Sequence, residues 1–79
     1  MLMLNEICIG RTYRHYKGKN YRVLGLARHT ETLEELVVYQ ALYATEFGTN
    51  SLWVRQKAMF LEPIEIDGVV KPRFAVVDE

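Results

Sequence analysis

Polar residues alternate with strand-forming residues in the first third of the chain. The segments 13–17 and 21–28 both have this pattern, and Gly18-Lys19-Asn20 between them is typical of a tight turn. This order of strand, turn and strand predicts a β-hairpin. Gly25 stands inside the second segment, which indicates a bulge or a sharp bend at that position.

The segment that follows the first hairpin is compatible with two kinds of structure. The sequence Thr32-Leu-Glu-Glu35 matches a helix capping box, and several apolar residues after it have helical spacing. The run Leu36-Val-Val-Tyr39 is β-branched and aromatic, and such residues favour a strand. We predict a turn at 30–34 and a strand at about 35–44. A helix near 32–44, which would produce an α+β roll, is the alternative.

The rest of the chain contains short elements separated by polar or turn residues. A polar loop at 45–51 precedes a short strand at 52–55, and residues 56–60 fit one tight helical turn. Apolar segments flank Asp67-Gly68, a dipeptide that favours the type I′ turn of a second hairpin. Pro72 restricts the returning strand to the edge of a sheet. Five or six short strands with tight turns predict an all-β fold, a small barrel that hides its strand edges by closure.

The composition is that of one small globular domain. The 79 residues are 49% hydrophobic and 25% charged, and they fit a single domain over residues 1–79. Cys8 is the only cysteine, so the chain forms no internal disulfide, and we expect a reducing, cytoplasmic compartment. No apolar run approaches the ~20 residues that span a bilayer, so no membrane partner is expected.

The charges divide the chain into two parts. Residues 1–29 carry six basic residues and one acidic residue, a net +5, and the remainder carries four basic and nine acidic residues, a net −5. A basic part attracts polyanions, but a chain of zero net charge has no strong long-range field. Pairing of the two parts across the fold is the simpler interpretation.

Several segments together resemble a small bacterial family. The pattern contains Gly10, Tyr13, His15-Tyr-Lys-Gly18, Tyr21-x-Val23-x-Gly25-x-Ala27, His29-Thr-Glu-Thr32, Leu36-Val-Val-Tyr39, Leu52-Trp-Val-Arg55 and Met59-Phe60. Over about residues 7–75 it resembles the domain-of-unknown-function family numbered sixteen fifty-three. The chain departs from that family at Gln56, where a proline is usual, and in a somewhat long loop at 45–51.

The resemblance implies an SH3-like barrel and a bacterial, cytoplasmic setting. It implies no catalytic residues. SH3-like barrels serve peptide binding, nucleic-acid binding and structural roles alike, so the fold by itself does not select a function.

An aromatic and basic face is the most suggestive candidate site. Tyr13, His15 and Lys17 are two residues apart and share one face of a strand. We expect neighbouring strands to add members, so the candidate binding residues are Tyr13, His15, Lys17, His29, Glu31, Tyr39, Tyr43, Trp53 and Arg55. Aromatic rings beside Lys and Arg suit a peptide groove or single-stranded nucleic acid. The structural alternative is that the Tyr and Trp side chains simply fill a small core.

These residues predict a non-catalytic binding module. A protein or peptide partner is preferred to nucleic acid, because nucleic-acid-binding domains are usually clearly basic. The expected hairpin separates His15 from His29, which lie toward its opposite ends, and this separation argues for an extended groove. The oligomeric state does not follow from the sequence.

A small hydrolytic or metal-dependent enzyme using His15, His29 and Glu31 is the remaining alternative. His29-Thr-Glu31 has the H-x-E spacing of zinc deaminases, but the chain lacks the cysteine-containing half of that motif. Ser51, the only serine, lies outside any nucleophile motif. We therefore expect no metal, no cofactor and no catalytic residue.

Overall fold

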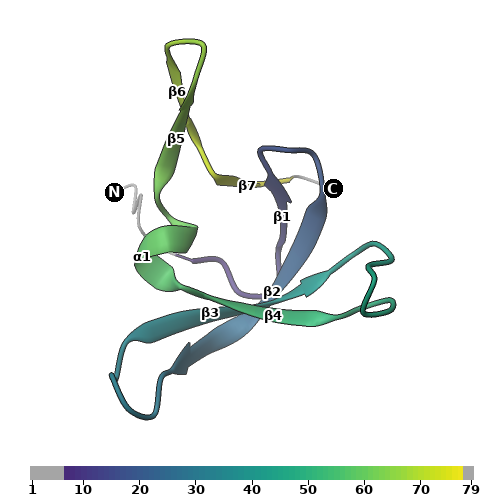
Figure 1. The fold of residues 1–79 in the computed structure, drawn as a ribbon, viewed down its shortest axis with the longest axis vertical. Coiled ribbons are helices and arrows are strands. Elements are labelled where there is room, and N and C mark those ends of the chain that lie inside the picture. The colour runs from purple at the N-terminus through teal and green to yellow at the C-terminus, as the bar shows by residue number, and fades with distance from the viewer. Residues whose placement is uncertain (1–6, 78–79) are drawn as a thin grey trace.

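The fold is known from a computed structural model that describes residues 7–77. Within these residues the chain forms seven strands and one short helix (Figure 1). In chain order they are β1 (Thr12–His15), β2 (Asn20–Arg28), β3 (Glu35–Ala41), β4 (Leu52–Gln56), α1 (Lys57–Phe60), β5 (Pro63–Ile66), β6 (Val69–Pro72) and β7 (Phe74–Val76).

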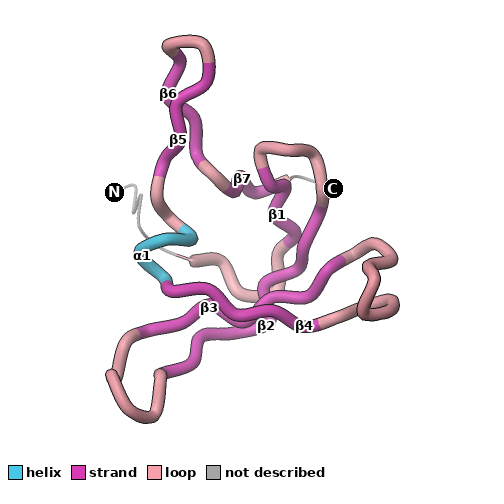
Figure 2. The backbone as a smooth tube through the Cα atoms, in the orientation of Figure 1, coloured by secondary structure: helices cyan, strands magenta, loops and turns pink. Residues whose placement is uncertain are grey.

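Five of the strands form one antiparallel sheet in the order β4-β3-β2-β1-β7. The strands β5 and β6 form a separate hairpin that projects from the body (Figure 2). The first four strands of the sheet follow the chain, each joined to the next by a turn or loop. The last strand, β7, returns from the projecting hairpin to pair with β1, so the two ends of the described chain meet in one sheet.

The sheet curls around an aromatic core. Its buried members come from the sheet, from α1 and from the segment before β1: Ile7, Tyr13, Val23, Val37, Tyr39, Phe60 and Phe74. The rings of Phe60 and Phe74 stack with centroids 4.1 Å apart. The guanidinium carbon of Arg55 on β4 lies 5.2 Å from the Phe74 ring centroid on β7. A long side chain of one edge strand therefore reaches the other edge strand across the curl of the sheet, as in a small, partly open barrel.

The predicted all-β class is confirmed. Both predicted hairpins are present, and the bulge expected near Gly25 occurs as a register shift between Val23 and Gly25. The predicted type I′ turn has positive φ at both central positions, 51° at Asp67 and 79° at Gly68. The predicted helical turn is α1.

The segment 30–44 is a turn followed by a strand, so the alternative helix near 32–44 is wrong. Leu33 has a φ of 65°, a left-handed conformation that no helix interior contains. The strand ends at Ala41, three residues before the predicted end at 44. It ends there because the chain bends at Leu42 and Tyr43, and Tyr43 turns to hydrogen-bond Tyr21.

One strand was not predicted. The sequence predicts five or six strands, and β7 has only three residues after Pro72. A segment this short carries no measurable period of two. Its extended form comes from pairing with β1, where Phe74 lies opposite His15 and Val76 lies opposite Tyr13.

Candidate functional site

Cationic and aromatic side chains gather where β1, β4 and β7 approach one another. We name this the cation–aromatic cluster and define it as His15, Tyr16, Lys17, Arg55, Arg73 and Phe74. The His15 ring packs edge-on against Phe74 at 4.9 Å between centroids and tilts over Tyr16 at 4.5 Å. Lys17 Nζ lies 5.8 Å from the Tyr16 ring centroid. The cluster therefore joins residues that are up to 59 positions apart in sequence (15 to 74).

The turn after β1 orients the His15 ring. Gly18 has a φ of 106°, which closes the turn and lets its N–H donate to the His15 carbonyl at 2.7 Å. The N–H of Lys17 donates to His15 Nδ1 at 3.2 Å. Because Nδ1 accepts this bond, the neutral ring carries its proton on Nε2.

The electrostatic field at the cluster is positive. Burial lowers the pKa of His15 below its ordinary value, and the charges of Arg55, Arg73 and Lys17 lower it further. Arg73 pairs with Glu62 at 3.3 Å. Within the described residues neither Arg55 nor Lys17 forms an ion pair. The cluster therefore holds more positive than negative charge.

Two tyrosines extend the cluster, Tyr21 on β2 and Tyr43 just after β3. The hydroxyls of Tyr21 and Tyr43 are hydrogen-bonded to each other, and Tyr21 also packs edge-on against Phe74 at 5.9 Å. Burial, and then the bond to Tyr43, raise the pKa of Tyr21 far above its ordinary value. Lys19 Nζ lies 4.8 Å from the Tyr43 ring centroid. The Tyr21 hydroxyl thus stays neutral, and the Tyr43 ring beside it is flanked by a further cation.

Of the predicted binding residues, His15, Lys17, Arg55 and Tyr43 lie at or beside this cluster. Tyr13 and Tyr39 are 5% exposed and belong to the core, where each packs edge-on against Phe60. The Tyr13 hydroxyl also accepts a hydrogen bond from the Cys8 N–H at 2.9 Å. These two rings face inward from β1 and β3, the strands on either side of β2, and fill the core.

Trp53 lies on β4 beside the loop 45–51. Its indole N–H donates to Ser51 Oγ at 3.0 Å, and Phe47 packs against its ring at 5.7 Å. Trp53 remains 37% exposed. The polar loop therefore shields one side of the indole and leaves part of the ring to solvent.

His29 and Glu31 lie in the turn at the far end of β2. The nine residues of β2 separate this turn from His15, a span of roughly 30 Å at 3.3 Å per residue. His29 Nδ1 accepts the N–H groups of Glu31 and Thr32 at 3.1 and 3.2 Å. The His29-Thr-Glu31 segment is therefore a turn that the His29 side chain caps. Across residues 7–77, no three His, Cys, Asp or Glu side chains gather as metal ligands would.

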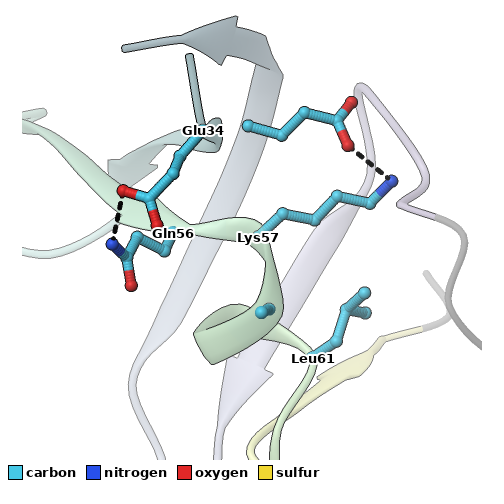
Figure 3. Close-up of a pocket in the computed structure, with 6 residues that line it drawn as sticks. Glu34, Gln56, Lys57 and Leu61 are labelled. Carbon is cyan, nitrogen blue, oxygen red and sulfur yellow. Dashed lines mark hydrogen bonds and ion pairs between the residues drawn. The ribbon is translucent and has the colours of Figure 1, made fainter. Parts of the chain in front are cut away.

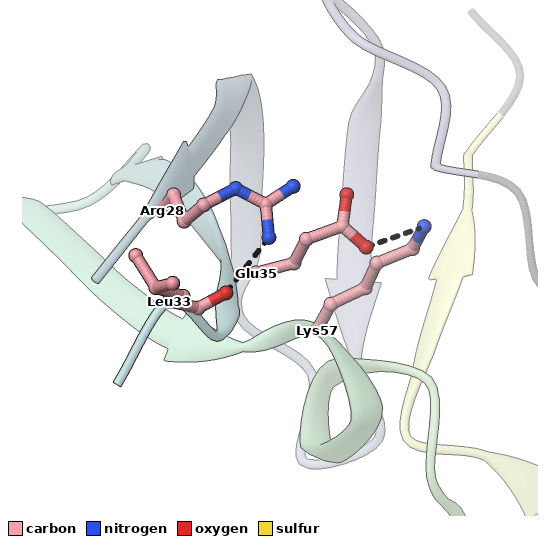
Figure 4. A network of polar contacts seen from close by, with 4 residues as sticks. All are labelled: Arg28, Leu33, Glu35 and Lys57. Atoms are coloured by element: carbon pink, nitrogen blue, oxygen red, sulfur yellow. Dashed lines mark hydrogen bonds and ion pairs between the residues drawn. The ribbon is translucent and has the colours of Figure 1, made fainter. Parts of the chain in front are cut away.

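An open pocket of about 370 Å³ lies between this turn and α1 (Figure 3). Gln56 Nε2 donates to Glu34 Oε1 at 2.9 Å, and Lys57 Nζ lies 3.5 Å from Glu35 Oε1. Nearby, Arg28 donates to the Leu33 carbonyl at 2.7 Å (Figure 4). Both carboxylates have partners, so these contacts fasten the turn and the start of β3 to the junction of β4 and α1.

Sequence reasoning missed Tyr16, Lys19, Arg73 and Phe74 as neighbours of His15. Phe74 and Arg73 follow Pro72 in a segment with no recognisable pattern. The one available signal was the basic N-terminal third, which contains Lys17 and Lys19. The curl of the sheet decides which basic residues of this N-terminal third lie against β4 and β7.

Comparison with known proteins gives a family and no activity. No curated protein matches the chain. No helix within the described part of the chain is long and apolar enough to cross a membrane. A crystal structure of a protein of the DUF1653 family from Bordetella bronchiseptica is 40% identical, with a TM-score of 0.80, over 95% of this chain and 92% of that one. The family model described as "Protein of unknown function (DUF1653)" matches residues 11–76. The chain therefore belongs to the DUF1653 family.

Proposed function

We propose that the chain is a non-catalytic binding module whose ligand is an acidic, extended segment of a partner protein. The observation that supports this most is the cation–aromatic cluster, in which Lys17, Arg55 and Arg73 surround His15 with Glu62 as the one paired carboxylate. Such a surface attracts an anionic segment and repels a basic one.

The cluster offers two kinds of contact to such a segment. A guanidinium presents a planar set of donors that fits a carboxylate in a bidentate manner, and Arg55 has no carboxylate partner among the described residues. Tyr16 is 39% exposed beside Lys17 and offers an aromatic surface for an apolar side chain. An acidic side chain followed by an apolar one would use both.

Single-stranded nucleic acid is the second candidate, because an exposed Tyr16 next to Lys17 could stack a base and hold a phosphate. The zero net charge of the chain favours a peptide over nucleic acid. An enzyme using His15, His29 and Glu31 is not favoured, since β2 separates the first of these from the other two. The single cysteine supports a cytoplasmic setting, and the family resemblance a bacterial one.

The test is fluorescence anisotropy with three labelled probes: a peptide of alternating Glu and Leu, its Gln-Leu counterpart, and an oligothymidylate. We expect the Glu-Leu peptide to bind and to weaken as salt rises. The double variant K17Q/R55Q should weaken binding at least about tenfold, which corresponds to about 1.4 kcal/mol.

The matched control is R14Q/R22Q, which removes the same charge from the other face of the sheet. Arg14 and Arg22 are exposed, and they lie opposite Asn20 and Thr12 rather than beside the core tyrosines. The control should change affinity less than about twofold. Equal weakening by both double variants would reduce the proposal to non-specific attraction. Preferential binding of the oligothymidylate would favour the second candidate.

A further inference from the structure

The strand β4 forms one edge of the five-stranded sheet and lacks the features that usually protect an edge (Figure 1). It contains no proline, and its pairing with β3 runs without a bulge over five residues. Leu52 and Val54 are 61% and 60% exposed. Natural sheets usually block such edges with prolines, lysines, bulges or short strands.

The other edges in the described residues are protected in these ways. The opposite edge of the sheet, β7, has three residues. The hairpin strands β5 and β6 carry Pro63 and Pro72 at their base, and Lys71 stands next to Pro72. The open edge of β4 is thus an exception within this fold, and its unpaired backbone groups can bind a partner strand.

The backbone groups of β4 that face this edge follow from its pairing with β3. Ala41 lies one step beyond the β3–β4 ladder opposite Ser51, and its N–H donates to the Ser51 carbonyl at 2.9 Å. Hydrogen-bonded pairs alternate along an antiparallel ladder, so the backbone groups of Trp53 and Arg55 point toward β3. The backbone groups that point to the free edge are therefore those of Leu52 and Val54 and the N–H of Gln56, whose carbonyl accepts the first bond of α1.

We propose that the partner strand is β4 of a second copy of this chain, paired antiparallel about a two-fold axis at Val54. In this register Val54 faces its own counterpart and Leu52 faces Gln56. The N–H and C=O groups of the two Val54 residues therefore pair with each other, and each Gln56 N–H meets a Leu52 carbonyl. The interface continues both sheets through one ladder and removes the exposed edge from each copy.

The charge on β4 selects this register. Arg55 is the one charged residue of the strand, and the axis at Val54 places it opposite the exposed Trp53 ring of the second copy. A guanidinium beside an indole ring is a favourable cation–π pair. An axis at Arg55 would instead place two arginines opposite each other, and like charges directly opposite destabilise a ladder.

The test of this pairing does not depend on the proposed ligand, because it uses the protein alone. Sedimentation velocity from the micromolar to the millimolar range should show a monomer–dimer equilibrium. Trp53 is the only tryptophan, so its emission should shift to shorter wavelength as the dimer forms. V54P removes an N–H that faces away from β3, so the variant should keep the fold and lose the dimer.

A charge-swap experiment tests the register. In V54K and in V54E, like charges oppose each other across the axis, so each variant should raise the dimer dissociation constant at least about tenfold. An equimolar mixture of V54K and V54E should recover dimers, since lysine then faces glutamate. The control is V70K, which introduces the same charge at a valine of β6 that is 67% exposed and should leave the equilibrium unchanged.

Two results would overturn the pairing. One is a wild-type chain that stays monomeric at every concentration, which would leave the edge to a strand from another protein. The other is a dimer that persists in V54P and V54K, because its interface would then lie elsewhere. If circular dichroism shows that V54P is unfolded, the mixture of V54K and V54E decides.

Discussion

Two turns at opposite ends of β2 each contain a histidine whose Nδ1 accepts a backbone N–H two residues later. In the β1–β2 turn this histidine is His15, whose ring packs against Phe74 and lies in the field of three cations. In the β2–β3 turn it is His29, which is exposed and bonded only to its own turn among the described residues. The local chemistry of the two turns is the same, and their surroundings differ.

The difference lies in which elements reach each turn. The curl of the sheet brings β7 and the end of β4 against the β1–β2 turn. These strands supply Phe74 and Arg55, and the residue before β7 supplies Arg73. The β2–β3 turn meets the junction of β4 and α1 through exposed polar pairs such as Gln56 with Glu34. His15 is part of the candidate site because segments distant in sequence pack on it. His29 has no such neighbours among the described residues, and its side chain only caps its own turn.

The largest difference between the two turns should appear on truncating an apolar side chain at each. Phe74→Ala removes the ring that stacks on Phe60 and packs against His15, and should lower the free energy of unfolding by about 3–5 kcal/mol. Leu33→Ala, at a side chain that is 62% exposed, should change it by less than about 0.5 kcal/mol. Urea denaturation followed by circular dichroism measures both. Similar losses of unfolding free energy in the two variants would contradict the proposed difference in packing between the two turns.

The next effect comes from backbone conformation. Gly18 has a φ of 106° with open space where a Cβ would stand, so Gly18→Ala introduces strain without a clash. We expect it to lower the free energy of unfolding by about 1–2 kcal/mol. Leu33 already bears such strain at a φ of 65°, so Leu33→Gly should raise the same quantity by up to about 1 kcal/mol. The midpoint of thermal denaturation should therefore fall in Gly18→Ala and rise in Leu33→Gly. A shift in the same direction for both variants would contradict the strain assigned to the two turns.

A smaller effect is expected from the hydroxyl pair beside the first turn. Tyr21→Phe should lower the free energy of unfolding by about 1 kcal/mol, because it removes the bond to Tyr43. Tyr43→Phe removes the same bond, so the double variant should lose less than the sum of the two single losses. The exposed pair at the other turn is the comparison, and Gln56→Ala should cost less than about 0.5 kcal/mol. Strictly additive losses for the two tyrosines would show that the hydroxyls do not act together.

The smallest effect should come from protonation of His15, whose ring is partly open to solvent. Its pKa in the folded chain lies below the ordinary value of 6.5, so the unfolded chain binds the proton more readily. The stabilisation by neutral His15 is therefore complete above pH 6.5 and is lost as the pH falls toward the pKa of the folded state. Urea denaturation at a series of pH values should lose this dependence in His15→Gln and keep it in His29→Gln. A pKa of His15 at or above 6.5 in an NMR titration would contradict the role of the cations.

Local sequence chemistry was sufficient for the hairpins and turns. Gly18, Gly25 and Asp67-Gly68 stand where the backbone bends or needs a positive φ, and these requirements act over a few residues. The β-branched run of β3 alternates buried and partly buried residues, which matches its period of two. The sequence by itself therefore determined the all-β class and most strand positions, because each depends on neighbours in the chain.

The tertiary structure alone decided the end of β3, the existence of β7 and the membership of the cluster. Phe74 is buried because β7 pairs with β1, a contact across some sixty residues that no local pattern encodes. The same curl of the sheet turned Tyr13 and Tyr39 inward, brought Arg55 to Phe74, and left His29 and Glu31 at the far end of β2. A strand face can be read from alternation, but which strands meet across a curled sheet depends on its closure, and closure is a property of the whole chain.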